Sequence, residues 1–215
     1  MQWTVVVPLK PLAQAKSRLS DTASAGLRPH LALAFAQDTV AAALASAAVR
    51  DVAVVTDDPL AGRELAALGA RIVADEPGGG LNAALAHAAA VVRRLRPGGA
   101  VAALNADLPA LRPPELARVL DAAAEFPRAF LPDAAGIGTT LLAAAPRREL
   151  RPAFGAHSRM AHRASGAVEL ALDAVESVRQ DVDTGDDLRA ALALGVGPRT
   201  AAAAARLLIP GQPAG

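Results

Sequence analysis

Cysteine and tyrosine are absent from this 215-residue chain, aromatic residues make up 2% of it, and only two of its 22 Lys and Arg residues are lysines. Without cysteine, disulfides and thiolate metal sites are excluded. With so few aromatic residues, the core must consist of Val, Leu, Ile and Ala, which suits a sheet covered by Ala-rich helices. No run of about 20 apolar residues occurs, so we expect no membrane span.

Charge and the amino-terminal sequence limit the classes of partner. The formal net charge is +1 and the arginines are dispersed, which gives no reason to expect a nucleic-acid partner. The chain opens on a valine-rich strand pattern rather than on a basic segment followed by an apolar stretch, so no secretory signal is predicted. We therefore expect a cytoplasmic protein, either a monomer or a homodimer.

Short apolar runs alternate with longer helical patterns in the first half of the chain. Strands are expected at 3–7, 51–56, 71–74 and 100–105, and helices at 31–48, 60–68, 81–95 and 114–125. This alternation predicts an α/β fold with a mostly parallel sheet and helices on both faces.

The second half is less regular. Strands are expected at 129–131, 139–145 and 167–171, with helices from 184 onward and over 201–208. We predict a single domain over residues 1–209 and a flexible tail over 210–215.

The segments that follow the first four strands are polar, and ligands of open α/β sheets bind at the carboxyl ends of the strands. We therefore expect residues 8–18, 56–58, 75–82 and 105–109 to converge on one rim. The two lysines, Lys10 and Lys16, lie in the first of these segments with Arg18. A compact ammonium in a chain that otherwise uses arginine indicates contact with a phosphate; the alternative is a solvated basic loop.

Gly78, Gly79 and Gly80 precede a predicted helix. Such a loop exposes backbone N–H groups to a phosphate or a base edge, although a merely flexible loop would have the same composition. Neither a GxxxxGK[ST] nor a GxGxxG motif is present, so the P-loop and dinucleotide-binding fingerprints fail.

Aspartates form the second group of candidates. Asp107 directly follows a buried strand, where a carboxylate suits a magnesium ligand or a turn. Asp181 and Asp183 are two residues apart, so in an extended segment they project to the same face and could hold a divalent ion. Helix capping by Asp183 or Thr184 is the alternative.

Glycines and hydroxyls are combined in two further loops, 136–140 and 154–158. Loops of this kind hold small anions through N–H and O–H donors, and ordinary turns are the alternative. The four histidines show no zinc-binding spacing, and we expect His162 to be structural.

Taken in order, these motifs resemble the guanylyltransferases of deazaflavin (factor-420) coenzyme biosynthesis, which activate 2-phospho-L-lactate or phosphoenolpyruvate with GTP. The matching segments span nearly the whole chain: 8–19, 80–85, 106–109, 132–142, 154–162 and 181–188. Ile137 departs from the pattern, because a small polar residue is expected between the two glycines. The resemblance implies a nucleotidyltransferase-type, glycosyltransferase-A-like three-layer sandwich.

The resemblance also implies roles for individual residues. Asp107, Asp181 and Asp183 would hold Mg²⁺, and Thr140, Gly155 and Ser158 would bind the phosphorylated three-carbon acid. Lys16, Gly79, Gly80 and Asn82 fall in regions that would contact GTP. Lys10, Lys16 and Arg18 would offset charge on the triphosphate and on the departing pyrophosphate.

The substrate class follows from the same resemblance. The 139–141 pattern and the composition lean towards the actinobacterial branch, which implies phosphoenolpyruvate, while 2-phospho-L-lactate and 3-phosphoglycerate remain open. Hand-over of an unstable product to the next enzyme is expected. The alternatives are another nucleotidyltransferase, acting on a sugar phosphate or molybdopterin, and a non-catalytic nucleotide-binding module. The first lacks support here, because the loop after the first strand does not have a Leu-Ala-Gly-Gly type sequence.

Overall fold

The computed structural model describes residues 1–207 except 15, 17–18, 20–21, 25 and 76–78. Its strands are β1 (Trp3–Pro8), β2 (Val49–Val55), β3 (Arg71–Val73), β4 (Ala100–Leu104), β5 (Arg128–Pro132), β6 (Thr139–Ala144) and β7 (Val168–Glu169). They form one seven-stranded sheet in the order β3-β2-β1-β4-β6-β5-β7. The predicted tail, 210–215, lies outside the described residues.

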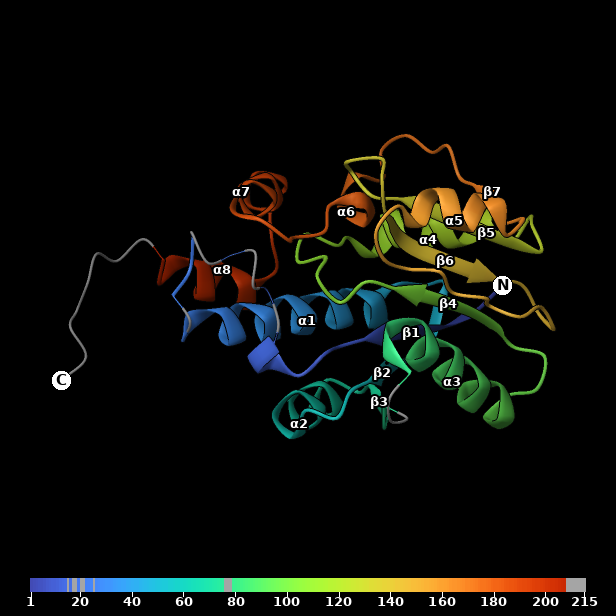
Figure 1. Ribbon diagram of the computed structural model, residues 1–215, viewed down its shortest axis with the longest axis horizontal. Coiled ribbons are helices and arrows are strands. Elements are labelled where there is room, and N and C mark those ends of the chain that lie inside the picture. Colours follow the sequence, from blue (N-terminus) through green and yellow to red (C-terminus); the bar gives the residue numbers. More distant parts are fainter. Residues whose placement is uncertain (15, 17–18, 20–21, 25, 76–78, 208–215) are drawn as a thin grey trace.

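The helices follow the predicted alternation (Figure 1). They are α1 (Leu27–Ala45), α2 (Pro59–Ala67), α3 (Gly80–Leu95), α4 (Pro113–Ala123), α5 (Ser158–Ala164), α6 (Glu176–Arg179), α7 (Gly185–Leu194) and α8 (Pro198–Ala205), with a short 3₁₀ turn η1 at Leu12–Gln14. In the described part of the chain, no helix has the length and hydropathy that a membrane crossing requires.

Most strand pairs are parallel, as predicted. β1 pairs in parallel with β2 and β4, β2 with β3, and β5 with β7. β6 is antiparallel to both β4 and β5. Since β6 runs opposite to β4, the start of β6 lies beside the end of β4, and the N–H of Asn105 donates to the carbonyl of Thr140 at 3.0 Å. Residues after β4 and before β6 therefore share one edge of the sheet.

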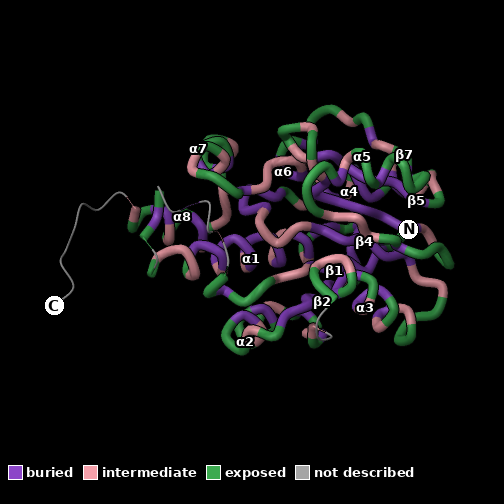
Figure 2. The backbone as a smooth tube through the Cα atoms, viewed as in Figure 1, coloured by how far each residue is buried: buried purple, intermediate pink, exposed green. Residues whose placement is uncertain are grey.

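Alternate residues of the central strands pack into two different cores, which is the pattern of a sheet covered on both faces. Val5 and Val7 belong to a core with residues of α1, α2 and α4, whereas Val6 belongs to a core with residues of α3. The predicted three-layer sandwich is confirmed. Figure 2 shows the buried strands between the more exposed helices.

Helix α8 lies on α1. Figure 1 shows α8 alongside α1. Asp38 of α1 fixes this contact, because its buried carboxylate accepts the backbone N–H groups of Arg199 (3.3 Å) and Thr200 (2.7 Å) in the first turn of α8. A third small core joins Leu19, Phe35, Val182 and Leu188 and so connects the segment after β1, α1 and α7.

Candidate functional site

A cleft of about 650 Å³ opens at the carboxyl edge of the parallel strands. Three of the four expected rim segments line it: the first through residues 8–10, 14 and 16, the third through Leu81, and the fourth through residues 105–107. The remaining wall comes from Ala32 of α1 and from residues 133, 137–139, 154–158, 181 and 183. The sheet rule therefore located the cleft correctly, although part of the wall comes from the second half of the chain.

The segment after β2 does not line the cleft, contrary to the expected convergence. Asp58 instead caps α2, accepting the N–H groups of Leu60 and Ala61 at 3.0 Å each. Its other oxygen accepts the N–H of Leu12 at 2.9 Å, and these N–H donors, that of Ala61 foremost, lower the pKa of Asp58. Asp58 thus anchors the start of the lysine-containing segment to the end of β2.

Asp107 is joined to the Asp181–Asp183 segment through the backbone. Its carbonyl accepts the N–H of Val182 at 3.0 Å. The side chain of Val182 is fully buried, while the flanking residues Asp181 and Asp183 both line the cleft. On the other side of Asp107, the N–H of Leu108 donates to the buried hydroxyl of Thr39 at 3.0 Å. These bonds hold all three aspartates at the same end of the cleft.

The capping alternative for Asp183 is resolved by α7. The cap is Thr184, which forms a capping box with Asp187. Asp187 also accepts the N–H of Asp183 at 3.1 Å and that of Thr184 at 2.7 Å. Asp183 is therefore not needed as the cap, and its carboxylate is directed to Lys16.

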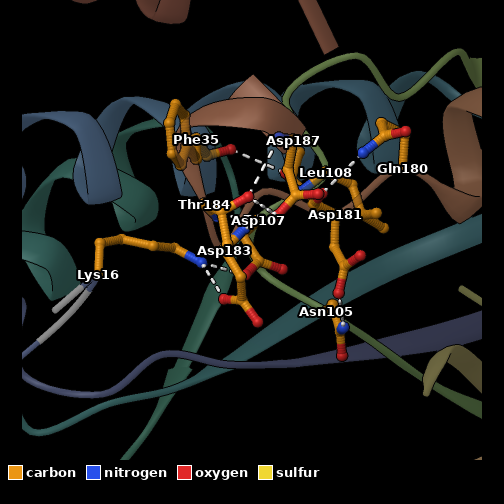
Figure 3. Close-up of polar contacts among 11 residues, drawn as sticks. Lys16, Phe35, Asn105, Asp107, Leu108, Gln180, Asp181, Asp183, Thr184 and Asp187 are labelled. Atoms are coloured by element: carbon orange, nitrogen blue, oxygen red, sulfur yellow. Dashed lines mark hydrogen bonds and ion pairs between the residues drawn. The ribbon is translucent and has the colours of Figure 1, made fainter. Parts of the chain in front are cut away.

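Lys16 lies between two of the predicted aspartates (Figure 3). Its ammonium donates to Asp183 at 3.1 Å and also forms an ion pair with Asp107. Burial opposes the charge of the ammonium, but Asp107 and Asp183 outweigh it, so the pKa of Lys16 is raised. The backbone at Lys16 is left-handed, with φ of 58°, a conformation that costs a non-glycine residue about 1 kcal/mol or more.

The carboxyl group of Asp181 lies in a buried position beside other carboxylates. Burial and the charges of Asp107, Asp183 and Asp133 raise the pKa of Asp181 to about 8. The side-chain amide of Asn105 lies beside its carboxylate at 3.4 Å. The ammonium of Lys16 is thus outnumbered by the neighbouring carboxylates. Carboxylate oxygens are the kind of ligand that Mg²⁺ prefers.

The predicted metal ligands have the chemistry that suits a divalent cation, but they are not arranged as a ready-made coordination sphere. Among residues that the structure describes, no group of three or more His, Cys, Asp or Glu side chains is close enough to hold a metal ion. The ammonium of Lys16 lies where Asp107 and Asp183 approach each other. Metal binding by the three aspartates remains a prediction.

The predicted acid-binding residues differ in exposure. Gly155 lines the cleft with φ of +131°, and a Cβ added there would meet nothing within 4 Å. Ser158 lines it as the first residue of α5, and its N–H donates to the carbonyl of Gly155 at 3.1 Å. Thr140 is fully buried and is not part of the cleft wall. Its hydroxyl has no hydrogen-bond partner within the described residues, so a ligand group that reached it would satisfy it.

The loop before β6 is organised by Asp133. Its carboxylate accepts the N–H groups of Ile137 (2.9 Å) and Gly138 (2.8 Å). A Cβ on Gly138 would lie 2.4 Å from that carboxylate, so glycine is required there. Ile137, the residue that departs from the family pattern, is 55% exposed at the cleft wall, so its side chain does not disturb the turn.

At both predicted nucleotide-binding glycines, Gly79 and Gly80, the local geometry disfavours any larger residue. Gly80 has φ of +71°, and a Cβ on Gly79 would lie 2.2 Å from Cβ of Ala83. Asn82 is not in the cleft wall. Its side chain bonds to the backbone of Phe154 twice, donating to the carbonyl at 3.0 Å and accepting the N–H at 2.7 Å. Gly78 lies outside the described residues.

The two predicted lysines differ in exposure and in pairing. Lys10 is exposed at the cleft, while Lys16 is paired with the aspartates. Arg18 lies outside the described residues.

His162 is structural, as predicted. It is fully buried, and its Nε2 accepts the N–H of Ala153 at 3.0 Å. The other ring nitrogen, Nδ1, therefore carries the proton and donates to the hydroxyl of Thr139 at 2.9 Å. Burial and then the charge of Arg128 lower the pKa of His162 to about 4, which keeps the ring neutral.

The sequence did not identify Asn105 or Asp133 as individual site residues. Asn105 was within a predicted rim segment, and Asp133 was within a family motif, so each gave a positional signal without a role. Asp58 lay within the expected rim segment 56–58, but its bond to Leu12 gave no signal, and Thr39 gave none at all, because their partners are far away in the sequence.

Comparison with known proteins gives matches over nearly the whole chain. Residues 3–206 match the family described as guanylyl transferase CofC like. A phosphoenolpyruvate guanylyltransferase of Streptomyces avermitilis is 86% identical over 211 residues, covering 98% of each chain. Another protein of that name, from Streptomyces coelicolor, is 82% identical, covering 99% of this chain and 100% of its own. One from Thermomonospora curvata is 60% identical, covering 96% of this chain and 90% of its own.

Solved structures with low sequence identity share the fold. A Methanothermobacter nucleotidyl transferase superposes with a TM-score of 0.61 at 21% identity, covering 90% of this chain and 97% of its own. A protein described as a nucleotide-diphospho-sugar transferase, from Desulfovibrio desulfuricans, gives a TM-score of 0.60 at 16% identity, with the same coverage. The nucleotidyltransferase-type fold is therefore confirmed.

Proposed function

The chain belongs to the CofC-like guanylyl transferase family, and from that premise we propose that its cleft transfers GMP from GTP to phosphoenolpyruvate with release of pyrophosphate. The observation that carries the proposal is the meeting of Lys16 with Asp107 and Asp183 in one cleft, beside the wall that holds Gly155 and Ser158. The groups that would bind the triphosphate and its cation thus lie next to the wall that would bind the small acid.

The reaction joins two phosphate groups. An oxygen of the acid's phosphate attacks the α-phosphorus of GTP, and the bond from that phosphorus to the bridging oxygen breaks. Pyrophosphate leaves with the electron pair. A phosphomonoester has a second pKa of about 6, so the attacking group is already ionised near pH 7. No general base is needed, which is consistent with the engagement of both ring nitrogens of His162.

The main barrier is the approach of two polyanions. Lys16, Lys10 and Arg18 would offset charge on the triphosphate and on the leaving pyrophosphate. Asp107, Asp181 and Asp183 would hold magnesium, which when bound supplies charge screening and orients both phosphates. Gly79 and Gly80 would allow GTP to approach the backbone before α3, and Gly155, Ser158 and Thr140 would hold the acid.

We further infer that the reaction serves deazaflavin coenzyme biosynthesis, as the sequence resemblance implies. The product, a phosphorylated acid joined to GMP through a diphosphate, would then be the activated substrate of a following transferase. Phosphoenolpyruvate is preferred over 2-phospho-L-lactate because relatives with 60–86% identity are named for it.

The test measures pyrophosphate release from GTP in the presence of phosphoenolpyruvate, 2-phospho-L-lactate or 3-phosphoglycerate. Each acid is assayed with and without Mg²⁺, and ATP replaces GTP as the control for base specificity. We expect release that requires GTP, Mg²⁺ and phosphoenolpyruvate together. Tight GTP binding without pyrophosphate release for any acid would instead indicate a non-catalytic binding module.

A further inference from the structure

Asn82 connects two parts of the cleft that lie far apart in the sequence. It is the third residue of α3, which begins at Gly80. Its amide nitrogen donates to the carbonyl of Phe154 at 3.0 Å, and its amide oxygen accepts the N–H of the same residue at 2.7 Å. One side chain thereby satisfies both backbone polar groups of Phe154, as a neighbouring strand would.

The segment that Asn82 holds has no regular structure of its own. Residues 150–154 form neither helix nor strand, so side chains must pair their backbone groups. Arg128 donates to the carbonyls of Leu150 and Arg151 at 3.1 Å each, and His162 accepts the N–H of Ala153. Asn82 supplies the last fixed point before Gly155. We call residues 150–155 the acid-side loop.

The fixed point at Phe154 matters because Gly155 comes directly after it. Gly155 has φ of +131°, and no atoms lie within 4 Å of where its Cβ would be. Its carbonyl accepts the N–H of Ser158 at 3.1 Å, so its placement depends on Phe154 before it and on the start of α5 after it. Phe154 is held by Asn82 and by an edge-to-face contact with His162, with ring centroids 5.0 Å apart. Leu81 and Phe154 both line the cleft, so α3 meets the acid-side loop at the cleft itself.

We propose that Asn82 is a positioning residue that fixes the acid-side loop to α3, and so sets the affinity for the phosphorylated acid rather than for the guanine base. This inference rests on the proposed function, because it assigns the acid to the wall formed by Gly155 and Ser158. It gives Asn82 a role different from the nucleotide contact that its place in the sequence suggested. It also explains why the residue is an amide: a donor and an acceptor are needed side by side.

The test compares the wild-type protein with Asn82→Ala and Asn82→Ser. Equilibrium dissociation constants are measured for phosphoenolpyruvate alone and for GTP alone. Loss of two hydrogen bonds should raise the constant for phosphoenolpyruvate by about 10-fold, and the constant for GTP should change by less than about 3-fold. The serine variant keeps a polar side chain near the start of the helix and guards against loss of folding.

Arg94→Ala is the matched control, because Arg94 is exposed near the other end of the same helix and does not line the cleft. It should leave both constants unchanged. The positioning role would be overturned if the Asn82 variants raised the dissociation constant for GTP as much as that for phosphoenolpyruvate, or if they changed neither constant.

Hydrogen exchange separates this proposal from the proposed function. In the ligand-free protein, the amide of Phe154 should exchange at least about 10-fold faster in Asn82→Ala than in the wild type. Unchanged exchange would refute the positioning role even if the enzyme uses phosphoenolpyruvate. Faster exchange in a protein whose wild type does not bind phosphoenolpyruvate would refute the proposed substrate while leaving Asn82 as the loop's anchor.

Discussion

The carbonyl of Asp107 accepts the N–H of Val182 at 3.0 Å, and this one backbone bond brings the loop after β4 against the segment before α7. Because Val182 is buried, its neighbours Asp181 and Asp183 are left at the cleft. The three carboxylates therefore owe their proximity to main-chain geometry, which substitution of a single side chain should leave intact. Their chemistry can be tested without rebuilding the fold.

Asp183→Asn should reduce pyrophosphate release on the order of 100-fold or more, because a neutral amide binds a divalent cation and the Lys16 ammonium more weakly. The melting temperature should stay close to that of the wild type, since Thr184 and Asp187 cap α7 without it. Asp186→Asn is the matched control: Asp186 is in the first turn of the same helix and pairs at the surface with Arg189. Full activity of Asp183→Asn would remove Asp183 from the metal site.

Lys16→Arg should lower kcat by about 10-fold or more. The bulkier guanidinium has to fit between Asp107 and Asp183 from a left-handed backbone, where the ammonium now lies. Steady-state kinetics with varied GTP would measure the change, and circular dichroism would check the fold. If the kinetics of Lys16→Arg are close to those of the wild type, catalysis does not require a lysine rather than an arginine at this position.

Acid should destabilise the protein through His162. Its pKa is about 4 in the folded state, against about 6.5 for an unfolded histidine. The unfolded state therefore binds the proton more readily, and the stability that the neutral ring provides is complete above about pH 6.5. It is lost as the pH falls towards 4, by up to roughly 3 kcal/mol.

Urea unfolding between pH 7.5 and 4 would measure this effect. His162→Gln cannot titrate, so the gap in unfolding free energy between wild type and variant should narrow as the pH falls. A gap that stays constant over this range would show that His162 is not the group responsible.

Asp38→Ala should loosen α8. The buried carboxylate accepts two N–H groups of that helix, and leaving them unpaired should cost about 1–3 kcal/mol of unfolding free energy. Gly197→Ala should act on the same contact, since its Cβ would lie 2.4 Å from the Asp38 carboxyl carbon. Urea unfolding would give the free energies, and amide exchange in 198–205 would localise the change. Slow exchange there in both variants would contradict this role.

The sequence predicted the elements whose signal is local and long. Helix α3 was expected at 81–95 and runs over Gly80–Leu95, because apolar residues recur on one side of it through several turns. Helices α5 and α6 were missed, since seven and four residues are too short to show that periodicity. The strand expected at 167–171 is only Val168–Glu169, where it pairs with β5 at the sheet edge.

Site residues were likewise predictable only where the signal was local. Asp107, Lys16 and Asp183 were each identifiable from their place after a strand or before a helix, and the structure brings them into contact. The pair of hydrogen bonds between Asn82 and Phe154 and the hydrogen bond from Leu12 to Asp58 could not be foreseen. Their partners are determined by packing between distant segments, for which a single sequence carries no local pattern.

The most direct measurement of the central claim, that these aspartates hold a divalent cation in the cleft, is Mn²⁺ binding followed by electron paramagnetic resonance in the absence of nucleotide. The wild type and Asp186→Asn should bind Mn²⁺ equally, whereas Asp181→Asn and Asp183→Asn should bind it at least about 10-fold more weakly. Equal binding by all four proteins would contradict the account.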